Sequence, residues 1–254
     1  MKLSHPVVLV HGNPESTALW GPLQAQLPGL DPILVSPPGF GVEADAEFDA
    51  SLESYVSWLG RELSRLDQPV HLLGHDWGGV LTLLLAMRRP DLLRSWTSDC
   101  LGVFDPEYVF HPLAREWQTD GAGEVAISRQ FGGDVASRAR VLEDFGIPAP
   151  MAGVLAADQV PSLVRVVLPL YRSIAQPVMS NHGANLDSAA ATPGLSILAE
   201  QDPVLGSQAS RLQAATRARA QTVRLSEAGH WWMLDQPATA ATALSRFWLL
   251  ADQS

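Results

Sequence analysis

Residues 70–87, VHLLGHDWGGVLTLLLAM, constrain the fold more than any other stretch of this sequence. A mostly apolar run leads into a turn with glycine at positions 74, 78 and 79, and a second apolar run follows. Strands of parallel sheets are buried on both faces and read as near-continuous apolar runs. Glycine permits a sharp turn that lifts the side chain of residue 76 above the sheet. The stretch therefore predicts a buried strand, a tight turn and a helix in immediate succession.

Similar apolar runs recur along the chain and alternate with helical stretches. We expect strands at Val7–Val10, Ile33–Ser36, Val70–Leu73, Ser95–Thr97, Leu195–Ala199 and Thr222–Leu225. We expect helices at Leu52–Arg65, Trp77–Arg89, Ser207–Arg219 and Ala238–Leu250. This alternation predicts an α/β fold, in which helices flank both faces of a mostly parallel sheet of about six strands.

The alternation is interrupted once, between residues 103 and 192. This interval has no core-strand pattern, and prolines divide it into several short helical pieces. Structured insertions of this length are more often functional than decorative. We therefore expect a core domain of residues 1–102 and 193–254 and a helical cap, or lid, of residues 103–192.

The composition narrows the possible partners. A formal net charge of −10 disfavours nucleic acid and anionic membrane surfaces. Cys100 is the only cysteine, which excludes an intramolecular disulfide, and His71 and His75 are spaced along a strand rather than a helix, which disfavours a metal pair. The apolar runs are too short for a signal peptide or a membrane span. We expect a cytoplasmic monomer or homodimer, without metal or cofactor, that acts on a small apolar molecule and water.

The turn places Asp76 where a nucleophile would stand. A carboxylate is already ionised at neutral pH and needs no base in order to attack. Its attack on an ester or amide would give an anhydride. Its attack on a saturated carbon that bears a leaving group gives an ordinary ester, which water can hydrolyse. The residue type therefore predicts an epoxide or a carbon–halogen bond as the substrate.

Hydrolysis of that ester requires an oxyanion hole and a base. The segment VLVHGNP follows the first strand and offers the Asn13 backbone N–H, which we pair with the N–H of Trp77 directly after the nucleophile. The segment EAGHWWML places His230 in a loop before the last helix. His230 is our candidate for the base.

A third group must orient the base, and Asp202 in LSILAEQDPV is our candidate for it. It follows a predicted strand at the carboxyl edge of the sheet, where the sites of open α/β sheets gather. The order Asp76, Asp202, His230 is nucleophile, acid, base, as this kind of fold requires. Glu200 is a less favoured alternative because it lies nearer the strand.

Five motifs resemble the α/β-hydrolase family, in particular its aspartate-nucleophile branch of epoxide hydrolases and haloalkane dehalogenases. They are HGNP at 11–14, PPGFG at 37–41, GHDWGG at 74–79, AEQDPV at 199–204 and AGHWWMLDQP at 228–237. The resemblance covers nearly the whole chain and implies an α/β-hydrolase fold that lacks the family's first two strands. In some relatives the acid follows the sixth strand, and Asp99 in WTSDC stands at that spacing as an alternative to Asp202.

The resemblance leaves two activities open. Trp77 and Asn13 resemble the halide donors of dehalogenases. Tyr171 in LPLYRSIAQ resembles a cap tyrosine that protonates the oxygen of an epoxide, and His111 in FHPLAREWQ resembles its histidine partner. We expect a hydrolase that opens an epoxide to a diol through an aspartyl alkyl ester. The alternative is a dehalogenase with the same Asp/His chemistry, and a catalytically silent binding protein is a remote third.

Overall fold

The computed structural model describes residues 2–253 and contains a six-stranded sheet in the order β2-β1-β3-β4-β5-β6. Every neighbouring pair of strands is parallel. All six predicted strands are present, with their ends displaced by two residues at most. The strands are β1 (Val7–Val10), β2 (Ile33–Val35), β3 (Val70–Gly74), β4 (Leu93–Ser98), β5 (Gly194–Ala199) and β6 (Gln221–Leu225).

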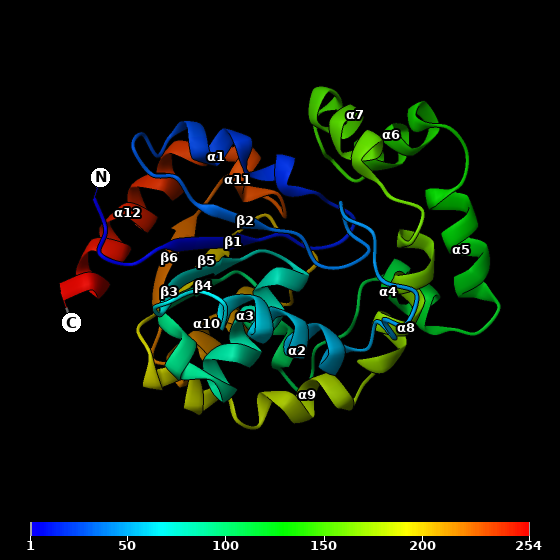
Figure 1. The fold of residues 1–254 in the computed structure, drawn as a ribbon. Helices are drawn as coiled ribbons and strands as arrows, with labels where there is room; N and C mark the ends of the chain where they lie inside the picture. Colours follow the sequence, from blue (N-terminus) through cyan, green and yellow to red (C-terminus); the bar gives the residue numbers. More distant parts are fainter. Residues whose placement is uncertain (1, 254) are drawn as a thin grey trace.

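Helices cover both faces of this sheet, as Figure 1 shows. The four predicted core helices are α2 (Leu52–Leu63), α3 (Trp77–Arg88), α10 (Gln208–Arg217) and α12 (Pro237–Gln253). Two short helices were not predicted, α1 (Gly21–Ala25) and α11 (Trp232–Asp235). Short 3-10 turns complete the core at η1 (Thr17–Trp20), η2 (Pro90–Leu92), η3 (Leu101–Phe104) and η4 (Leu186–Ala191).

The two faces of the sheet bury separate apolar clusters. Alternate residues of β1 show the division: Val8 and Val10 pack in the cluster that contains α2 and α3, while Val7 and Leu9 pack in the cluster that contains α1 and α12. Successive side chains of a strand point to opposite faces, so a strand covered on both sides must be apolar throughout. This explains the near-continuous apolar runs in the sequence.

The expected burial is wrong at the two edges of the sheet. Ile33 of β2 is 39% exposed, and β6 exposes Gln221, Thr222 and Arg224. An edge strand has a neighbour on one side only, and the flanking helices do not cover it completely. Polar residues are therefore tolerated at β6.

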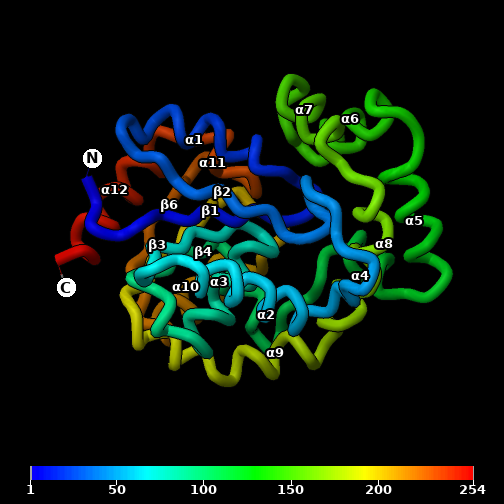
Figure 2. The backbone as a smooth tube through the Cα atoms, in the orientation of Figure 1, coloured from blue at the N-terminus to red at the C-terminus, as the bar shows by residue number. Residues whose placement is uncertain are grey.

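A helical insertion separates β4 from β5, as expected. Its helices are α4 (Pro112–Gln118), α5 (Ala122–Phe131), α6 (Val135–Asp144), α7 (Ala149–Asp158), α8 (Leu163–Ser173) and α9 (Val178–Gly183). Figure 2 shows α4 to α8 gathered at one end of the sheet, while both chain ends lie at the other end. Within the described residues no single helix is long and apolar enough to cross a membrane. The helices α7 and α8 together have the length and composition of a membrane span, but the chain bends by 97° between them.

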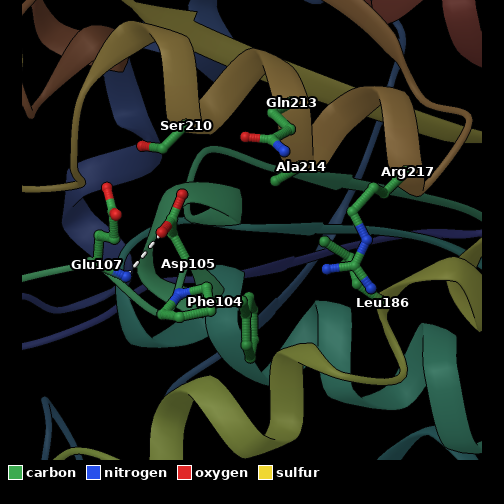
Figure 3. Close-up of a pocket in the computed structure, with 9 residues that line it drawn as sticks. Phe104, Asp105, Glu107, Leu186, Ser210, Gln213, Ala214 and Arg217 are labelled. Carbon is green, nitrogen blue, oxygen red and sulfur yellow. Dashed lines mark hydrogen bonds between the residues drawn. The ribbon is translucent and has the colours of Figure 1, made fainter.

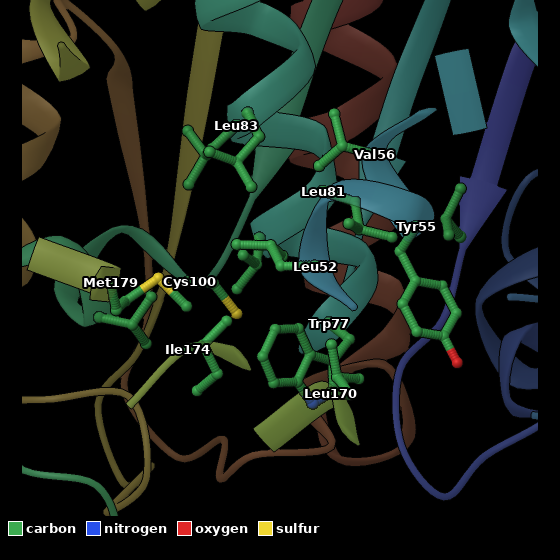
Figure 4. Packing of buried hydrophobic residues seen from close by; sticks show 14 of the residues in the cluster. Leu52, Tyr55, Val56, Trp77, Leu81, Leu83, Cys100, Leu170, Ile174 and Met179 are labelled. Carbon is green, nitrogen blue, oxygen red and sulfur yellow. The ribbon is translucent and has the colours of Figure 1, made fainter. Parts of the chain in front are cut away.

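The insertion is joined to the core by buried apolar side chains. Leu170 and Ile174 from the α8 region and Met179 of α9 pack in one cluster with Trp77 and Cys100, as Figure 4 shows. Burial of large apolar side chains contributes about 1.5–3 kcal/mol for each residue. This shared cluster fixes α8 above the carboxyl ends of the central strands.

The sharp turn between β3 and α3 is centred on residue 76, as the sequence predicted. Asp76 itself has the positive φ, 49°, with ψ −122°. Gly74 and Gly78 are required for space instead: a Cβ on Gly78 would collide with the Val10 carbonyl, and one on Gly74 would collide with the Gly78 carbonyl. The glycines therefore allow α3 to approach β1 and β3 closely.

This close approach predicts that Gly78→Ala destabilises the protein. The added methyl group meets rigid backbone, and we expect a loss of about 3 kcal/mol in the free energy of unfolding, measured by urea denaturation. The matched control is Gly153→Ala in α7, where an added Cβ meets no atom within 4 Å. The control should gain about 0.5–1 kcal/mol, since alanine is a better helix former than glycine. Equal stability of the two variants would contradict the steric argument.

Candidate active site

The elbow presents the Asp76 carboxylate above the carboxyl end of β3. The Asn13 backbone N–H donates a hydrogen bond of 2.9 Å to Asp76 Oδ2. The other oxygen, Oδ1, lies 4.0 Å from Nε2 of His230. Gly12 permits this geometry, because a Cβ there would collide with the Asp76 carboxylate and would lie 2.7 Å from the Trp77 amide nitrogen. One carboxylate oxygen is thus held by a backbone donor and the other faces an imidazole.

His230 and Asp202 are brought together as predicted. His230 Nδ1 and Asp202 Oδ2 are 2.9 Å apart, and the Val204 N–H donates to the other Asp202 oxygen at 2.6 Å. The buried guanidinium of Arg211 donates to the carbonyl oxygens of Ala199 and Asp202, at 2.9 and 3.3 Å. These bonds fix the loop after β5. They also fix the orientation of the His230 ring, with Nε2 toward Asp76.

The electrostatics favour the protonated form of His230. Burial opposes the charged ring, but the carboxylate of Asp202, assisted by Asp76 and Asp99, outweighs it and raises the pKa of His230 to about 10. The same pair lowers the pKa of Asp202, since the attraction of His230 outweighs burial. The positive ring is therefore stabilised by its carboxylate neighbours, and loss of the Asp76 charge would lower its pKa.

Asp99, the alternative acid, contacts a different histidine. Its Oδ2 is hydrogen-bonded to His75 Nδ1 and accepts from the Trp232 indole at 2.7 Å. Its Oδ1 accepts from the Asp76 backbone N–H at 3.2 Å. Burial opposes its ionisation, but His75 outweighs burial and lowers the pKa of Asp99 to about 2. Asp99 thus supports the elbow from below, while Asp202 is the carboxylate hydrogen-bonded to His230. Glu200 pairs with Arg224 instead, at 2.6 Å.

The single cysteine is part of the same support. Cys100 is fully buried, and its thiol donates to the Asp76 carbonyl oxygen at 3.0 Å and to Asp99 Oδ1 at 3.1 Å. Burial and the nearby Asp99 and Asp76 carboxylates raise the pKa of Cys100 well above its ordinary value. The thiol therefore stays protonated directly below the nucleophile.

Glu15 is a buried member of the site that the sequence analysis missed. Its two oxygens accept from the Gly12 N–H at 2.9 Å and from the Trp231 indole at 3.1 Å. Glu15 therefore ties the loop that carries Asn13 to the loop that carries His230. Its place directly after the HGNP motif could have indicated Glu15 as a site residue. Its bond to Trp231 could not be predicted, because the two residues are 216 positions apart in the sequence.

One group of side chains in the described part of the active site has donor atoms close enough to bind a single metal ion. It consists of Glu15, His75 and His230. Their ligand atoms lie within 4.8 Å of one another. Glu15 Oε1 is 4.0 Å from His75 Nε2. A metal here would displace hydrogen bonds that Glu15 already accepts, so we assign the group to the buried hydrogen-bond network.

Tyr171 lies on α8 and reaches over the nucleophile. Asn13 Nδ2 donates to the Tyr171 hydroxyl at 3.4 Å, and the Trp77 and Tyr171 rings meet edge to face at 5.2 Å. The Trp77 indole nitrogen is buried, and among residues 2–253 no acceptor lies in good hydrogen-bond geometry to it. Burial and the Asp76 carboxylate raise the pKa of Tyr171 well above its usual value, although the Asn13 and Trp77 donors act in the opposite direction. Two N–H donors and one phenol thus converge beside Asp76.

The structure does not bring His111 into contact with Tyr171. His111 caps α4, where its Nδ1 accepts from the Ala114 N–H at 3.2 Å. The Trp117 ring packs against both, at 6.3 Å from the His111 ring and 4.6 Å from the Tyr171 ring. Burial lowers the pKa of His111. A neutral ring whose Nδ1 accepts a hydrogen bond carries its proton on Nε2.

A cavity of about 440 Å³ opens above these groups. Its walls combine Asp76, His230 and Tyr171 with side chains of the insertion. The apolar and aromatic residues that line it are Pro14, Leu113, Trp117, Phe131, Phe145, Pro203, Val204 and Trp231. A pocket of this size and lining suits a small apolar ligand.

A second pocket, of about 360 Å³, lies between η3 and α10. Figure 3 shows Asp105, Glu107, Gln213 and Arg217 around it, with the Glu107 N–H bonded to Asp105 at 2.7 Å. None of the candidate catalytic residues lines it. Asp76, His230 and Tyr171 line the first cavity instead.

Comparison with known proteins places this site in a family. A family described as having the alpha/beta hydrolase fold matches residues 5–237, which is most of the chain. The chain belongs to the α/β-hydrolase family. The turn between β3 and α3, which carries Asp76, lies inside the matched segment and is the candidate for the family's nucleophile elbow.

The relatives of this α/β-hydrolase include a haloalkane dehalogenase of Mesorhizobium japonicum. The two are 26% identical over an alignment of 275 positions, gaps included, which covers 97% of this chain and 85% of that protein. The solved haloalkane dehalogenase DbeA from Bradyrhizobium elkani USDA94 has a TM-score of 0.70 at 18% identity, over 99% of this chain and 92% of that one. The solved E-2-(acetamidomethylene)succinate hydrolase has a TM-score of 0.71 at 17% identity, over 97% and 92%. Because these names differ, the structural likeness supports the fold alone.

The carboxylates around His230 predict a coupled titration. In Asp76→Asn the loss of one negative charge should lower the pKa of His230 below its wild-type value of about 10. Histidine ring NMR over pH 5–11 measures this shift. The pKa of His182, on the surface beside Arg88 and Glu53, serves as the internal control. A His230 pKa that is unchanged in Asp76→Asn would contradict the coupling.

The two hydrogen bonds of Glu15 predict a structural role. Glu15→Gln keeps one acceptor oxygen but turns an amide donor toward the other N–H, and we expect a loss of about 1–3 kcal/mol in the free energy of unfolding. Chemical denaturation measures the loss. The exposed Glu47→Gln, as the matched control, should change the stability by no more than about 0.5 kcal/mol. Wild-type stability of Glu15→Gln would rule out this bridging role.

Proposed function

We propose that this α/β-hydrolase is a dehalogenase that hydrolyses the carbon–halogen bond of a small haloalkane. The observation that carries the proposal is the pair of side-chain donors, Asn13 Nδ2 and the buried Trp77 indole N–H, that converge beside Asp76. A departing halide needs hydrogen-bond donors and no proton. Apart from the Tyr171 hydroxyl, the Trp77 indole N–H has no hydrogen-bond partner among residues 2–253, so a leaving anion would compete only with that hydroxyl.

The comparisons support this choice over the epoxide hydrolase that we expected from the sequence. The Mesorhizobium japonicum relative, whose similarity spans nearly the whole chain, is named a haloalkane dehalogenase. The cavity lining is also largely apolar, as a haloalkane requires. We therefore rank dehalogenation first.

In the first step, Asp76 Oδ1 attacks the carbon that bears the halogen. The carbon–halogen bond breaks, its electron pair leaves with the halide, and an alkyl ester forms on Asp76. Asn13 Nδ2 and the Trp77 indole hydrogen-bond the halide. Oδ2 remains with the Asn13 backbone N–H, at the 2.9 Å observed here.

In the second step, esterification removes the charge of Asp76 and lowers the pKa of His230, which then loses its proton. His230, oriented by Asp202 through the 2.9 Å contact, accepts a proton from water as the water attacks the Asp76 carbonyl carbon. The Asn13 backbone N–H, with that of Trp77, stabilises the oxyanion. Collapse releases the alcohol, which takes the proton from His230 and leaves Asp76 as a carboxylic acid. Transfer of the Asp76 proton to His230 restores the starting carboxylate and the protonated ring. The sum is R–X + H₂O → R–OH + H⁺ + X⁻.

Epoxide hydrolysis is the second candidate, and the Tyr171 hydroxyl is the observation that favours it. This hydroxyl accepts from Asn13 Nδ2, and Tyr171 lines the same cavity as Asp76. Its raised pKa keeps it protonated, so it can donate to the oxygen of an opening epoxide. His111 lines the same cavity as Tyr171. It would assist by contacting the bound epoxide, since it does not contact Tyr171.

The two candidates predict opposite effects at two residues. If the substrate is a haloalkane, Trp77→Phe should lower the rate of halide release by about 100-fold, since one leaving-group donor is lost, and Tyr171→Phe should retain activity. If it is an epoxide, Tyr171→Phe should lower diol formation by about 100-fold or more. Halide release and diol formation are measured on panels of short haloalkanes and epoxides.

Two further variants complete this experiment. Asp76→Asn should abolish either activity. His230→Gln should stop turnover after the first step, so that mass spectrometry detects the alkyl ester on Asp76. Diol formation without halide release would reverse our ranking. The absence of turnover and of any ester on both panels would favour a silent binding protein.

A further inference from the structure

Two histidines and an aspartate meet at the amino-terminal edge of the sheet, far from the active site. Asp252 Oδ1 lies 2.9 Å from His5 Nδ1 and 3.0 Å from His71 Nε2. The three ligand atoms lie within 4.8 Å of one another. His5 precedes β1, His71 is the second residue of β3 and Asp252 is in the last turn of α12. The cluster thus joins three separate elements.

The donor set and its spacing suit a divalent transition metal. Imidazole nitrogen and carboxylate oxygen bind zinc at about 2.0–2.2 Å, so neighbouring ligand atoms in a tetrahedral site are about 3.3 Å apart. The two observed separations from Asp252 Oδ1, 2.9 and 3.0 Å, need only a small expansion. The His5 side chain is partly exposed and free to adjust.

The surroundings orient the two deeper ligands. His71 is fully buried, and its Nδ1 contacts Ser95 Oγ at 2.7 Å, which leaves Nε2 for the shared position. Metal-bound histidines usually hold their second nitrogen in this way. The Ser4 N–H donates to Asp252 Oδ2 at 2.6 Å and fixes the carboxylate.

We propose that His5, His71 and Asp252 form a structural site for one divalent transition metal ion, typified by zinc, with water as the fourth ligand. The ion would hold the segment before β1 and the last turn of α12 against β3. The sequence analysis predicts no metal, because Asp252 is separated from His5 by 247 residues and from His71 by 181. No periodic motif can reveal ligands so far apart.

The proposal is tested by titrating the purified full chain with zinc chloride in isothermal calorimetry. We expect saturable binding of one zinc per chain that is lost in both His5→Ala and Asp252→Asn. The matched control is His182→Ala, which removes another partly exposed histidine that lies beside a carboxylate, and it should bind as the wild type does. At tenfold excess over the dissociation constant, zinc should raise the melting temperature by about 4 °C, and EDTA should reverse the rise.

The possible results distinguish zinc binding at this cluster from zinc binding elsewhere on the protein. Binding that persists in His5→Ala and disappears in Glu15→Gln would place the ion in the active site and overturn the proposal. The absence of saturable binding, or of a zinc-dependent melting shift in the wild type, would leave the cluster a hydrogen-bonded network and would also overturn it. Hydrolytic activity should be equal with zinc and with EDTA, because the cluster is one strand length, about 16 Å, from Asp76.

Discussion

The close packing of α3 against β1 and β3 is the constraint on which the site depends. Gly78 brings the helix backbone onto the Val10 carbonyl, and this proximity sets Asp76 within reach of the Asn13 amide. The positive φ of Asp76 is one result, since the chain must reverse within a few atoms. A residue in such a conformation persists only when its surroundings determine it, and here Asp99 and Cys100 bond the Asp76 backbone from below.

The second organising feature is an excess of carboxylates over imidazoles. Asp76, Asp99 and Asp202 lie around His75 and His230, and Glu15, whose pKa is raised by burial, lies beside them. Removing ions from water is costly, and each buried carboxylate here has hydrogen-bond donors directed at it. The imbalance keeps His230 protonated while Asp76 is free. Under the proposed function, formation of an ester on Asp76 would correct the imbalance, so the charge of His230 would follow the state of Asp76.

The sequence predicted what is local and missed what joins distant segments. All six strands follow from short, near-continuous apolar runs, and the four long core helices follow from the helical stretches between them. The helices α1 and α11 have only five and four residues and carry too weak a pattern. The candidate nucleophile, acid and base were found because each follows its own strand, and parallel strands end at one edge. The partner of Asp99 was not found, because the choice between His75 and His230 depends on side-chain reach. Contact between His111 and Tyr171 was expected, but Trp117 packs against both rings.

The buried thiol of Cys100 has a consequence for a protein that would handle alkylating substrates. Haloalkanes and epoxides modify thiolates, and an exposed cysteine would slowly inactivate its own enzyme. This chain has one cysteine in 254 residues, and it lies beneath the elbow with its proton held by neighbouring oxygens. A thiol in this state is a poor nucleophile. If the proposed chemistry holds, the buried thiol would escape alkylation by the substrate, and the alkyl group would go to Asp76, from which water can remove it.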